Sequence, residues 1–442
     1  MSGRTPSIPE SDLPAVLLGD LTTSARRRIV ASATLGTLFD GADFAIFLIF
    51  LVPIATYFDV PVLAVILINA TSYVVGIAGG ILFGLLADRK GRRVALSAAI
   101  ATFSVFTLAS AFAPTIWWLL VLRVLAGIGI GGESGVAFAL INEVLPSRRS
   151  RRGALSGAVQ TMFIFGNFLA FAIFSLTTTH WGTEAWRWAF ALLGIGGFLS
   201  FAVRYWMPES PQWLAAQRVR SEARVEESSM AVLREILAPP LRTRAVRCSL
   251  LMATAFFGAY AIISFAPSMW LKSYGLPAGV VAQLGYAGSA AAILGYVING
   301  VLSDYIGRRR SFVLFGVLGT IAYVLFGLTT VTGWGTITAT SYWTSPVLLV
   351  FLLAELGYGY HGSQGVWLSE MYPTRVRATA QNLVYYIGRA IGAGLAPVVA
   401  LWVAQRLGGD FRLAITFGVI GAAGTALMAL TLPETKGSDL TL

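Results

Sequence analysis

Residues 84–93 read G-L-L-A-D-R-K-G-R-R and form a short basic turn between two apolar runs. A weaker copy, G-V-L-S-D-Y-I-G-R-R-R, occupies residues 300–310. In both places a long apolar segment ends at the aspartate, and another apolar segment follows the arginines. A charged turn that recurs at matching places in an apolar chain indicates an internal duplication, and it predicts two related helical bundles.

The composition is that of a membrane protein. Of the 442 residues 56% are hydrophobic and 12% are charged, whereas soluble proteins carry about 25% charged residues. The net charge of +11 does not indicate nucleic-acid binding, because the basic residues cluster in short turns, as they do on a cytoplasmic membrane surface. The single cysteine, Cys248, and the two histidines, His180 and His361, make an internal disulfide or a zinc enzyme improbable.

Twelve stretches have the roughly 20 apolar residues that a transmembrane helix requires. The predicted fold is therefore all-α and integral to the membrane, with two bundles of six helices. The predicted spans are 29–57, 62–87, 94–113, 116–145, 153–177, 188–207, 248–273, 277–302, 311–332, 346–372, 379–404 and 413–432.

A polar linker separates the two predicted bundles. Residues 1–28 form a tail without the features of a signal peptide, residues 29–207 the first bundle, residues 208–247 the linker, residues 248–432 the second bundle and residues 433–442 a second tail. Short helices are expected in the linker. The arginine-rich connections alternate with connections that carry few basic residues, so both termini are predicted to be cytoplasmic. The compact size and short loops favour a bacterial inner membrane, with the chain crossing the lipid bilayer several times.

Several motifs resemble those of the major facilitator superfamily over almost the whole chain. The two basic turns are the most specific of them. The sequence R-V-L-A-G-I-G-I-G-G at 123–132 resembles the family's fourth-helix motif, and E-V-L-P at 143–146 is matched by E-M-Y-P at 370–373 in the second half. The resemblance implies a monomeric transporter that works by alternating access.

Two sets of motifs point to different branches of that family. The sequence D-G-A-D at 40–43 and Y-P-T-R-V-R-A-T at 372–379 are similar to motifs of proton-coupled organic-acid symporters for aromatic acids and sialate. P-E-S-P-Q-W-L at 208–214 and P-E-T-K-G at 433–437 are similar to motifs of sugar porters. The sugar porters' glutamine-rich seventh-helix motif is missing, because residues 256–265 read F-F-G-A-Y-A-I-I-S-F.

Acidic residues inside the spans are candidates for proton coupling, because a charge at the bilayer centre costs about 2.5–3.5 kcal/mol or more. Asp40 and Asp43 lie roughly 15–20 Å into the first span at 1.5 Å per residue, on one helix face where two carboxylates repel. Glu133 lies at similar depth and either accepts a proton or pairs with Arg389. The alternative for all three is a purely structural ion pair with a buried arginine.

Arg389 is the main candidate for binding a substrate. Its planar guanidinium matches a carboxylate, and the alternative is a salt bridge to Glu133, Asp40 or Asp43. His361 is a candidate for donating to substrate or carrying a proton, and the alternative is a hydrogen bond to a neighbouring helix. The other candidate contacts to substrate are Gln364, Tyr385, Asn382, Gln160, Asn167 and Tyr260.

Acidic and basic residues at the arginine-rich ends of the spans suggest a gate of ion pairs that biases two conformations. Arg123, nearer the other end of its span, is grouped with them. Its alternative roles are to lower the pKa of a neighbouring carboxylate, to bind substrate, or to extend outward to the membrane interface. The predicted gating residues are Asp88, Arg92, Arg123, Glu143, Arg149, Asp304, Arg308, Glu370 and Arg377.

These features together predict a proton-coupled symporter of a small organic anion, driven by the proton gradient and needing no other cofactor. A sugar or polyol symporter is the nearest alternative, and a membrane sensor that signals without transporting is a second. No nucleophile, histidine and acid set or metal cluster indicates an enzyme.

Overall fold

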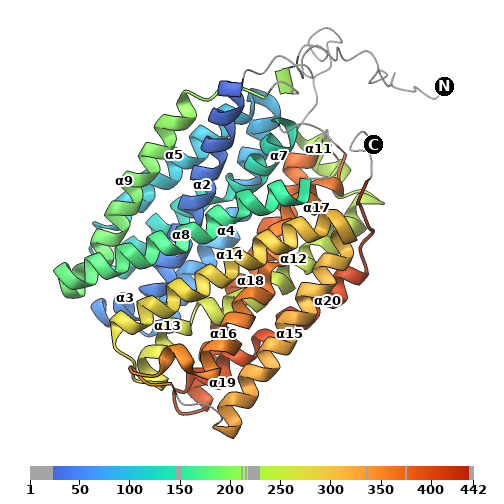
Figure 1. The fold of residues 1–442 in the computed structure, drawn as a ribbon. Helices are drawn as coiled ribbons and strands as arrows, with labels where there is room; N and C mark the ends of the chain where they lie inside the picture. The colour runs from blue at the N-terminus through green and yellow to red at the C-terminus, as the bar shows by residue number, and fades with distance from the viewer. Residues whose placement is uncertain are drawn as a thin grey trace.

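The computed structural model describes residues 23–144, 152–210, 213–214, 217, 229–333, 337–373 and 376–437 (Figure 1). Within these ranges the chain is helical and forms no strand. Ten stretches are long and apolar enough to cross a membrane. One of them, 152–205, contains two helices, and the predicted span 346–372 is absent from the ten because it is divided into shorter helices.

The first half of the chain forms six membrane-crossing segments. Two of these segments are interrupted: the first near Phe50, and the fourth at Gly132 and Glu133. The helices of this half are α2 (Thr23–Ile49), α3 (Leu51–Tyr57), α4 (Val62–Lys90), α5 (Arg92–Ser110), α6 (Ile116–Gly131), α7 (Ser134–Val144), α8 (Arg152–Trp181) and α9 (Ala185–Tyr205), with the 3₁₀ turn η2 (Gly182–Glu184) before α9.

The second half repeats this plan after the short linker helix α11 (Ser229–Ile236). The segment that corresponds to the predicted span 346–372 is broken at the 3₁₀ turn η5 (Tyr358–Tyr360). The remaining elements are α12 (Leu241–Ile263), α13 (Ala266–Ser268), η3 (Met269–Ser273), α14 (Ala278–Ile306), α15 (Arg308–Thr332), η4 (Tyr342–Thr344), α16 (Pro346–Gly357), α17 (His361–Glu370), α18 (Arg377–Arg406), α19 (Phe411–Thr416) and α20 (Gly418–Leu430).

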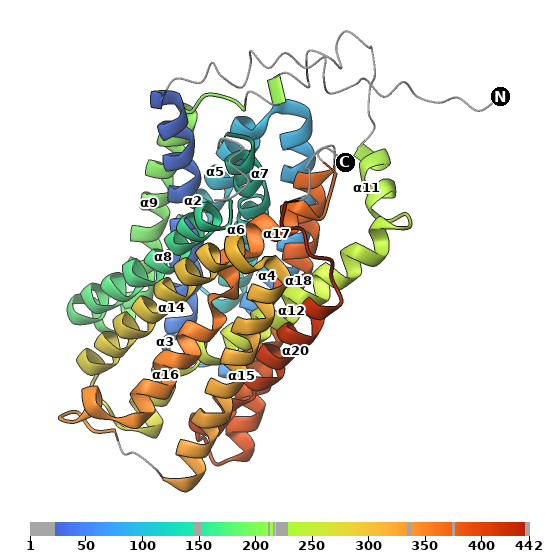
Figure 2. The ribbon, with the colours of Figure 1, turned by 45° about the vertical axis from the view of Figure 1, so that its right-hand side comes forward.

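The two halves meet along two helix pairs. α4 packs against α18, and α8 packs against α14 (Figure 2). Glycines permit the close approach of α8 and α14: a Cβ atom on Gly157 would lie 2.9 Å from the carbonyl oxygen of Tyr296, and one on Gly300 would lie 2.7 Å from the carbonyl oxygen of Gly153. Small residues at helix contacts are the usual means of close packing inside a membrane.

The repeated basic turns have the same conformation in both halves. Gly91 and Gly307 have φ angles of 103° and 99°, which favour glycine. Each turn is capped by a glutamate from the end of its own half. The Glu209 carboxylate accepts hydrogen bonds from the backbone N–H groups of Arg92 and Arg93, at 2.9 and 3.1 Å. The internal duplication therefore extends to the helix caps.

Glu434 supplies the matching cap in the second half. Its carboxylate accepts from the backbone N–H groups of Arg308 and Arg309, also at 2.9 and 3.1 Å. Glu209 and Glu434 are the glutamates of the two motifs that resemble those of sugar porters. Their position gives those motifs a structural role at the N-termini of α5 and α15.

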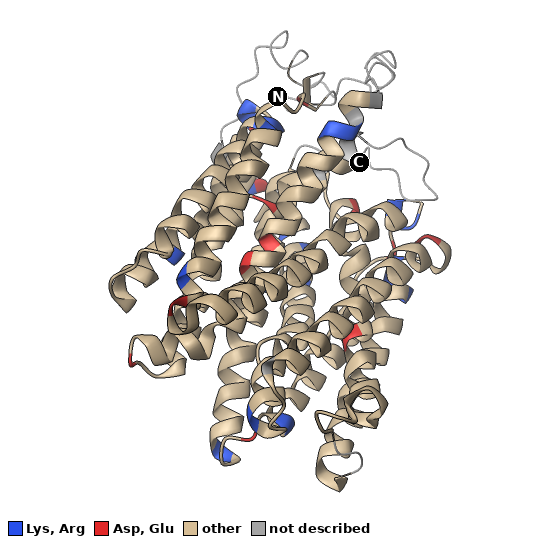
Figure 3. Cartoon of the chain, turned by 60° about the vertical axis from the view of Figure 1, so that its left-hand side comes forward, with Lys and Arg blue, Asp and Glu red and all other residues tan. Residues whose placement is uncertain are grey.

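These turns and both described ends of the chain lie at one end of the bundle, called here the basic end (Figures 1 and 3). Along the helices many outward-facing side chains are apolar and exposed, such as Leu67, Val74 and Leu427. A helix that is apolar on its outward face as well as its inward one suits a lipid environment. The charged residues inside the bundle are therefore exceptions that need a physical explanation.

Candidate functional site

Arg389 of α18 and Asp40 of α2 form an ion pair between the two halves. The Nη1 atom of Arg389 donates to both carboxylate oxygens of Asp40, at 3.1 and 3.2 Å. The Nε atom donates to the Tyr260 hydroxyl at 3.2 Å. Both charged side chains are buried, with exposed fractions of 4% for Asp40 and 1% for Arg389. The sequence offered three carboxylates as possible partners of Arg389. In the structure Asp40 is the one that pairs with it.

Aromatic rings enclose this pair. The guanidinium carbon of Arg389 lies 5.1 Å from the centre of the Tyr73 ring and 5.8 Å from that of Phe44. The rings of Phe44 and Tyr260, which belong to different halves, have their centres 4.3 Å apart. Phe163 and Tyr386 also face the guanidinium. Such rings stabilise a cation through their faces, and they also form flat apolar walls.

Asp43 forms a second pair, but within the first half. Arg123 of α6 donates to its two carboxylate oxygens through Nη1 and Nη2, at 2.7 and 2.5 Å. Arg123 is 2% exposed, so it does not extend outward to the membrane surface. Asp40 and Asp43, although they lie on the same helix, therefore pair with different arginines. Arg123 also lies apart from the predicted gating residues at the basic end.

Glu133 forms a third pair, again within the first half. Its partner is Arg204 of α9, whose Nη1 donates to the carboxylate at 2.6 Å and whose Nη2 bonds to the other oxygen. The predicted alternative of a bond from Glu133 to Arg389 is therefore wrong, because Glu133 lies between α6 and α7 and faces α9. Sequence analysis missed Arg204. Its place near the end of an apolar span looks like an interfacial anchor.

The other predicted contacts to substrate are distributed differently. Tyr260 bonds to Arg389, and the Tyr385 ring lies 5.2 Å from that of Phe256. The amide of Asn382 joins the two halves, accepting from Gly135 N–H at 2.7 Å and donating to the Gly80 carbonyl at 3.3 Å. Both polar atoms of this amide are therefore already used in hydrogen bonds between the two halves.

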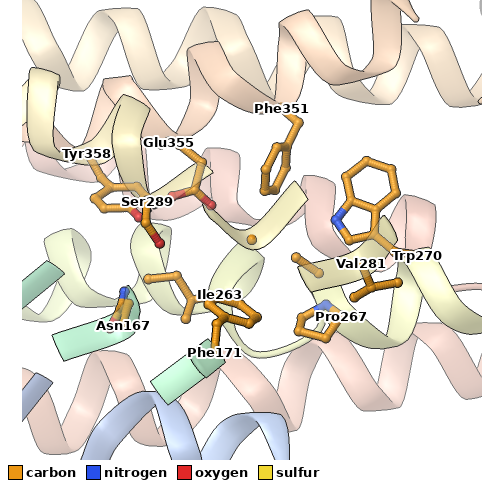
Figure 4. Close-up of a pocket in the computed structure, with 12 residues that line it drawn as sticks. Asn167, Phe171, Ile263, Pro267, Trp270, Val281, Ser289, Phe351, Glu355 and Tyr358 are labelled. Atoms are coloured by element: carbon orange, nitrogen blue, oxygen red, sulfur yellow. Dashed lines mark hydrogen bonds between the residues drawn. The ribbon is translucent and has the colours of Figure 1, made fainter. Parts of the chain in front are cut away.

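Three of the remaining candidates each have one buried polar side-chain atom without a hydrogen-bond partner among the described residues. The Nδ1 atom of His361 bonds to Gln364 Oε1 at 2.5 Å, whereas Gln364 Nε2 is unpaired. The side-chain carbonyl oxygens of Gln160 and Asn167 are also buried and unpaired. Asn167 lines a cavity together with residues of the second half such as Glu355 and Trp270 (Figure 4). Unpaired buried groups of this kind are available to a ligand or to water.

At the basic end, each repeated aspartate bonds to the opposite half. Asp304 of α14 accepts from the backbone N–H groups of Gly153 and Ala154 at the start of α8, both at 2.9 Å. Asp88 of α4 accepts from the Thr379 hydroxyl at the start of α18, at 2.9 Å. These contacts join the two halves at the basic end. A carboxylate at a helix N-terminus is favoured by the helix dipole.

Arginines hold the same aspartates in place. Arg92 bonds to Asp88 at 2.8 Å, and Arg308 bonds to Asp304 at 2.7 Å and to Glu370 at 3.2 Å. The Nε atom of Arg377 donates to the backbone carbonyls of Ser369 and Tyr372. The predicted gating residues Glu143 and Arg149 lie outside what the structure describes, the first in its side chain only. Among the described residues, no group of His, Cys, Asp or Glu is placed to hold a metal.

The chain matches the Major Facilitator Superfamily over residues 33–397. It belongs to this family. A probable 4-methylmuconolactone transporter of Cupriavidus pinatubonensis is 32% identical, over 84% of this chain and 82% of that protein. The proton:xylose symporter XylE has a similar structure, with a TM-score of 0.76 over 95% of this chain and 98% of that one, but at 21% identity this likeness establishes only the fold.

Other relatives carry different kinds of substrate. The niacin transporter of Acinetobacter baylyi is 26% identical, over 83% of this chain and 84% of that protein. The arabinose-proton symporter of Bacillus subtilis is 27% identical, over 93% of each protein. This chain is thus a multi-pass membrane transporter and not an enzyme. Its relatives include transporters of organic acids and of sugars.

Proposed function

We propose that this transporter carries a small organic anion together with a proton, and that a carboxylate of the substrate binds Arg389. The observation that carries this proposal is the Asp40–Arg389 pair. It is buried, it joins the two halves, and its contacts of 3.1 and 3.2 Å are longer than those of Asp43 with Arg123 and of Glu133 with Arg204. Only one guanidinium nitrogen of Arg389 bonds to Asp40. Of these three pairs it is therefore the one in which a substrate carboxylate most readily replaces the aspartate.

Proton and anion binding are linked through this pair. When Asp40 takes up a proton, it loses its charge, and Arg389 then requires another anion. A substrate carboxylate supplies that anion and forms charge-assisted hydrogen bonds with the planar guanidinium. Release of the proton restores the Asp40–Arg389 pair and displaces the substrate. The cycle moves a proton and a monoanion together, and so it is driven by the pH gradient.

The rings around Arg389 suit a flat substrate. Phe44 and Tyr73 line the guanidinium with aromatic faces, and the ring of Tyr260 packs against Phe44. A planar substrate ring stacks favourably against such faces. We therefore expect an unsaturated or aromatic carboxylate to bind better than a flexible one. The relatives named for niacin and 4-methylmuconolactone support this expectation.

Alternating access follows from the contacts at the basic end. Opening that end requires Asp304 to leave the start of α8 and Asp88 to leave the start of α18. The arginine pairs of the predicted gate then favour one conformation or the other. We propose that the basic end faces the cytoplasm of a bacterial inner membrane, because basic residues accumulate on that side.

A sugar substrate remains the second candidate, because of the arabinose-proton symporter among the relatives. The two motifs at 208–214 and 433–437 do not strengthen it. Their glutamates cap α5 and α15 at the basic end, whereas Arg389 lies midway along α18.

Thermal stabilisation of the purified protein by nicotinate or by arabinose distinguishes the two candidates. We expect nicotinate to raise the unfolding temperature, more strongly at acidic pH, because a bound ligand stabilises the folded state. The variant Arg389→Ala should lose this effect, and Arg389→Lys should retain only part of it, because lysine lacks the planar fork. Stabilisation by arabinose alone, unchanged in Arg389→Ala, would refute the assignment.

A further inference from the structure

A cavity lies between α8 of the first half and the helices α12, α14 and α16 of the second (Figure 4). Its polar lining includes Glu355, Tyr358 and Ser289 from the second half and Asn167 from the first. Its volume is about 40 Å³, enough for about three water molecules at roughly 10–15 Å³ each. That is too small for the proposed substrate, but sufficient for water and a proton.

Glu355 differs from the three membrane carboxylates described above because it has no arginine. It is 5% exposed, and within the described residues it forms no ion pair. The Tyr358 hydroxyl donates to its Oε2 atom. A charged carboxylate left buried without a cation is costly, and the group commonly avoids that cost by taking up a proton.

The groups that face Glu355 from the surrounding helices do not supply a positive charge. The titratable side chains that interact with it are Tyr358 next to it, Tyr296 of α14 and Tyr323 of α15. The cavity residues of α8 and of the α12–η3 segment are uncharged: Asn167, Phe171, Ile263, Ala266, Pro267 and Trp270.

The same cavity contains polar atoms that lack partners. The Oδ1 atom of Asn167 and the Nε1 atom of Trp270 are buried and have no hydrogen-bond partner within the described chain. Water in the cavity can bond to both and to the carboxyl of Glu355, since a buried water typically makes two to four hydrogen bonds. Asn167 belongs to the first half and Glu355 to the second, so such a network would join them.

We propose that Glu355 is a second proton-binding site, which holds a proton in this conformation and exchanges it with water through the cavity. The proton joins one carboxylate oxygen, and the Tyr358 hydroxyl continues to bond to the group. Asp40 and Glu355 would then place one exchangeable proton on each half. A cycle that released both with a monoanion would move net positive charge.

Infrared spectroscopy of the purified full-length protein tests this site, because a protonated carboxyl has a C=O stretching band that a carboxylate lacks. We expect wild type minus Glu355→Gln to show that band at acidic pH, and to lose it at alkaline pH. Glu434→Gln serves as the matched control. It removes an exposed carboxylate at the basic end and should not remove the band.

Tyr358→Phe provides a second test that retains the carboxyl. It removes the hydroxyl that bonds to Glu355, so the band should shift but remain, and this test stands even if Glu355→Gln does not fold. Absence of the band at acidic pH would overturn the proposal, as would a band that persists unchanged at alkaline pH. The spectrum requires no substrate, so its failure is distinct from failure of the proposed anion transport.

Discussion

Two aspartates three residues apart on α2 pair with arginines from different halves of the molecule. Asp43 pairs with Arg123 within the first half, through two guanidinium nitrogens at 2.5 and 2.7 Å. Asp40 pairs with Arg389 of the other half, through one nitrogen at 3.1 and 3.2 Å. Short bidentate pairs are the stronger kind. This contrast supports our proposal that the pair between the halves exchanges with substrate, whereas the pair within the first half stabilises its bundle.

Breaking the pair within the first half should have the largest effect on stability. Arg123→Ala leaves Asp43 buried without a cation, and loss of one partner of a buried pair costs about 3–5 kcal/mol. We expect this variant to unfold at a much lower temperature than wild type in a thermal unfolding measurement.

The double variant Asp43→Leu with Arg123→Met is its control. It removes both charges and keeps side chains of apolar bulk, so it should regain most of the lost stability. If Arg123→Ala unfolded like wild type, or if the double variant were the less stable of the two, the pair would not have this structural role.

Loss of the contact between Asp304 and the start of α8 should cost less free energy than loss of the Asp43–Arg123 pair. Asp304→Asn removes the negative charge at the start of α8, which is worth up to about 2 kcal/mol in a partly buried setting. A loss of about 1–2 kcal/mol changes a population ratio by about five- to thirtyfold. Spin labels at the basic ends of α8 and α14 should therefore report more of the open form.

Asp410→Asn is the control for that measurement. Asp410 pairs with Arg412 before α19, away from the basic end, so its loss should leave the distance distribution unchanged. An unchanged distribution in Asp304→Asn would contradict a gate at this contact.

The smallest effects are expected from the helix caps of the repeated turns. Glu209→Gln and Glu434→Gln each weaken one capping carboxylate, at a cost of about 0.5–1 kcal/mol. Because the two caps have the same hydrogen bonds, the two variants should lower the unfolding temperature by similar amounts. Neither should change which ligands stabilise the protein. A change in ligand preference would show that these motifs influence the substrate.

Much of the fold could be predicted from the sequence because the physical signals are local. The predicted apolar runs are helical, ten stretches among the described residues are long and apolar enough to cross a membrane, and each copy of the basic turn ends one long helix and begins the next. The burial of Arg389 could be predicted because a charge flanked by glycines and apolar residues is exceptional at that depth. These inferences need only the depth of a residue along its own helix.

The pairing of the charges could not be predicted, because it depends on how helices rotate and pack against each other. Glu133, Asp40 and Asp43 were all at a suitable depth to meet Arg389, and only the arrangement of the helices in the folded bundle brings Asp40 to it. Arg204 was missed because its depth alone suggests an interfacial anchor. In the structure it is fully buried and paired with Glu133.

Proton uptake during anion binding tests the central claim most directly. Calorimetry of nicotinate binding in buffers with different ionisation enthalpies counts the protons taken up, and linkage requires the proton and the anion to affect each other equally. We predict uptake of about one proton per anion by the wild-type protein, where Arg389 exchanges Asp40 for substrate. In Asp40→Asn, binding should persist without that uptake. Anion binding without proton uptake by the wild type, or equal uptake by Asp40→Asn, would contradict the account.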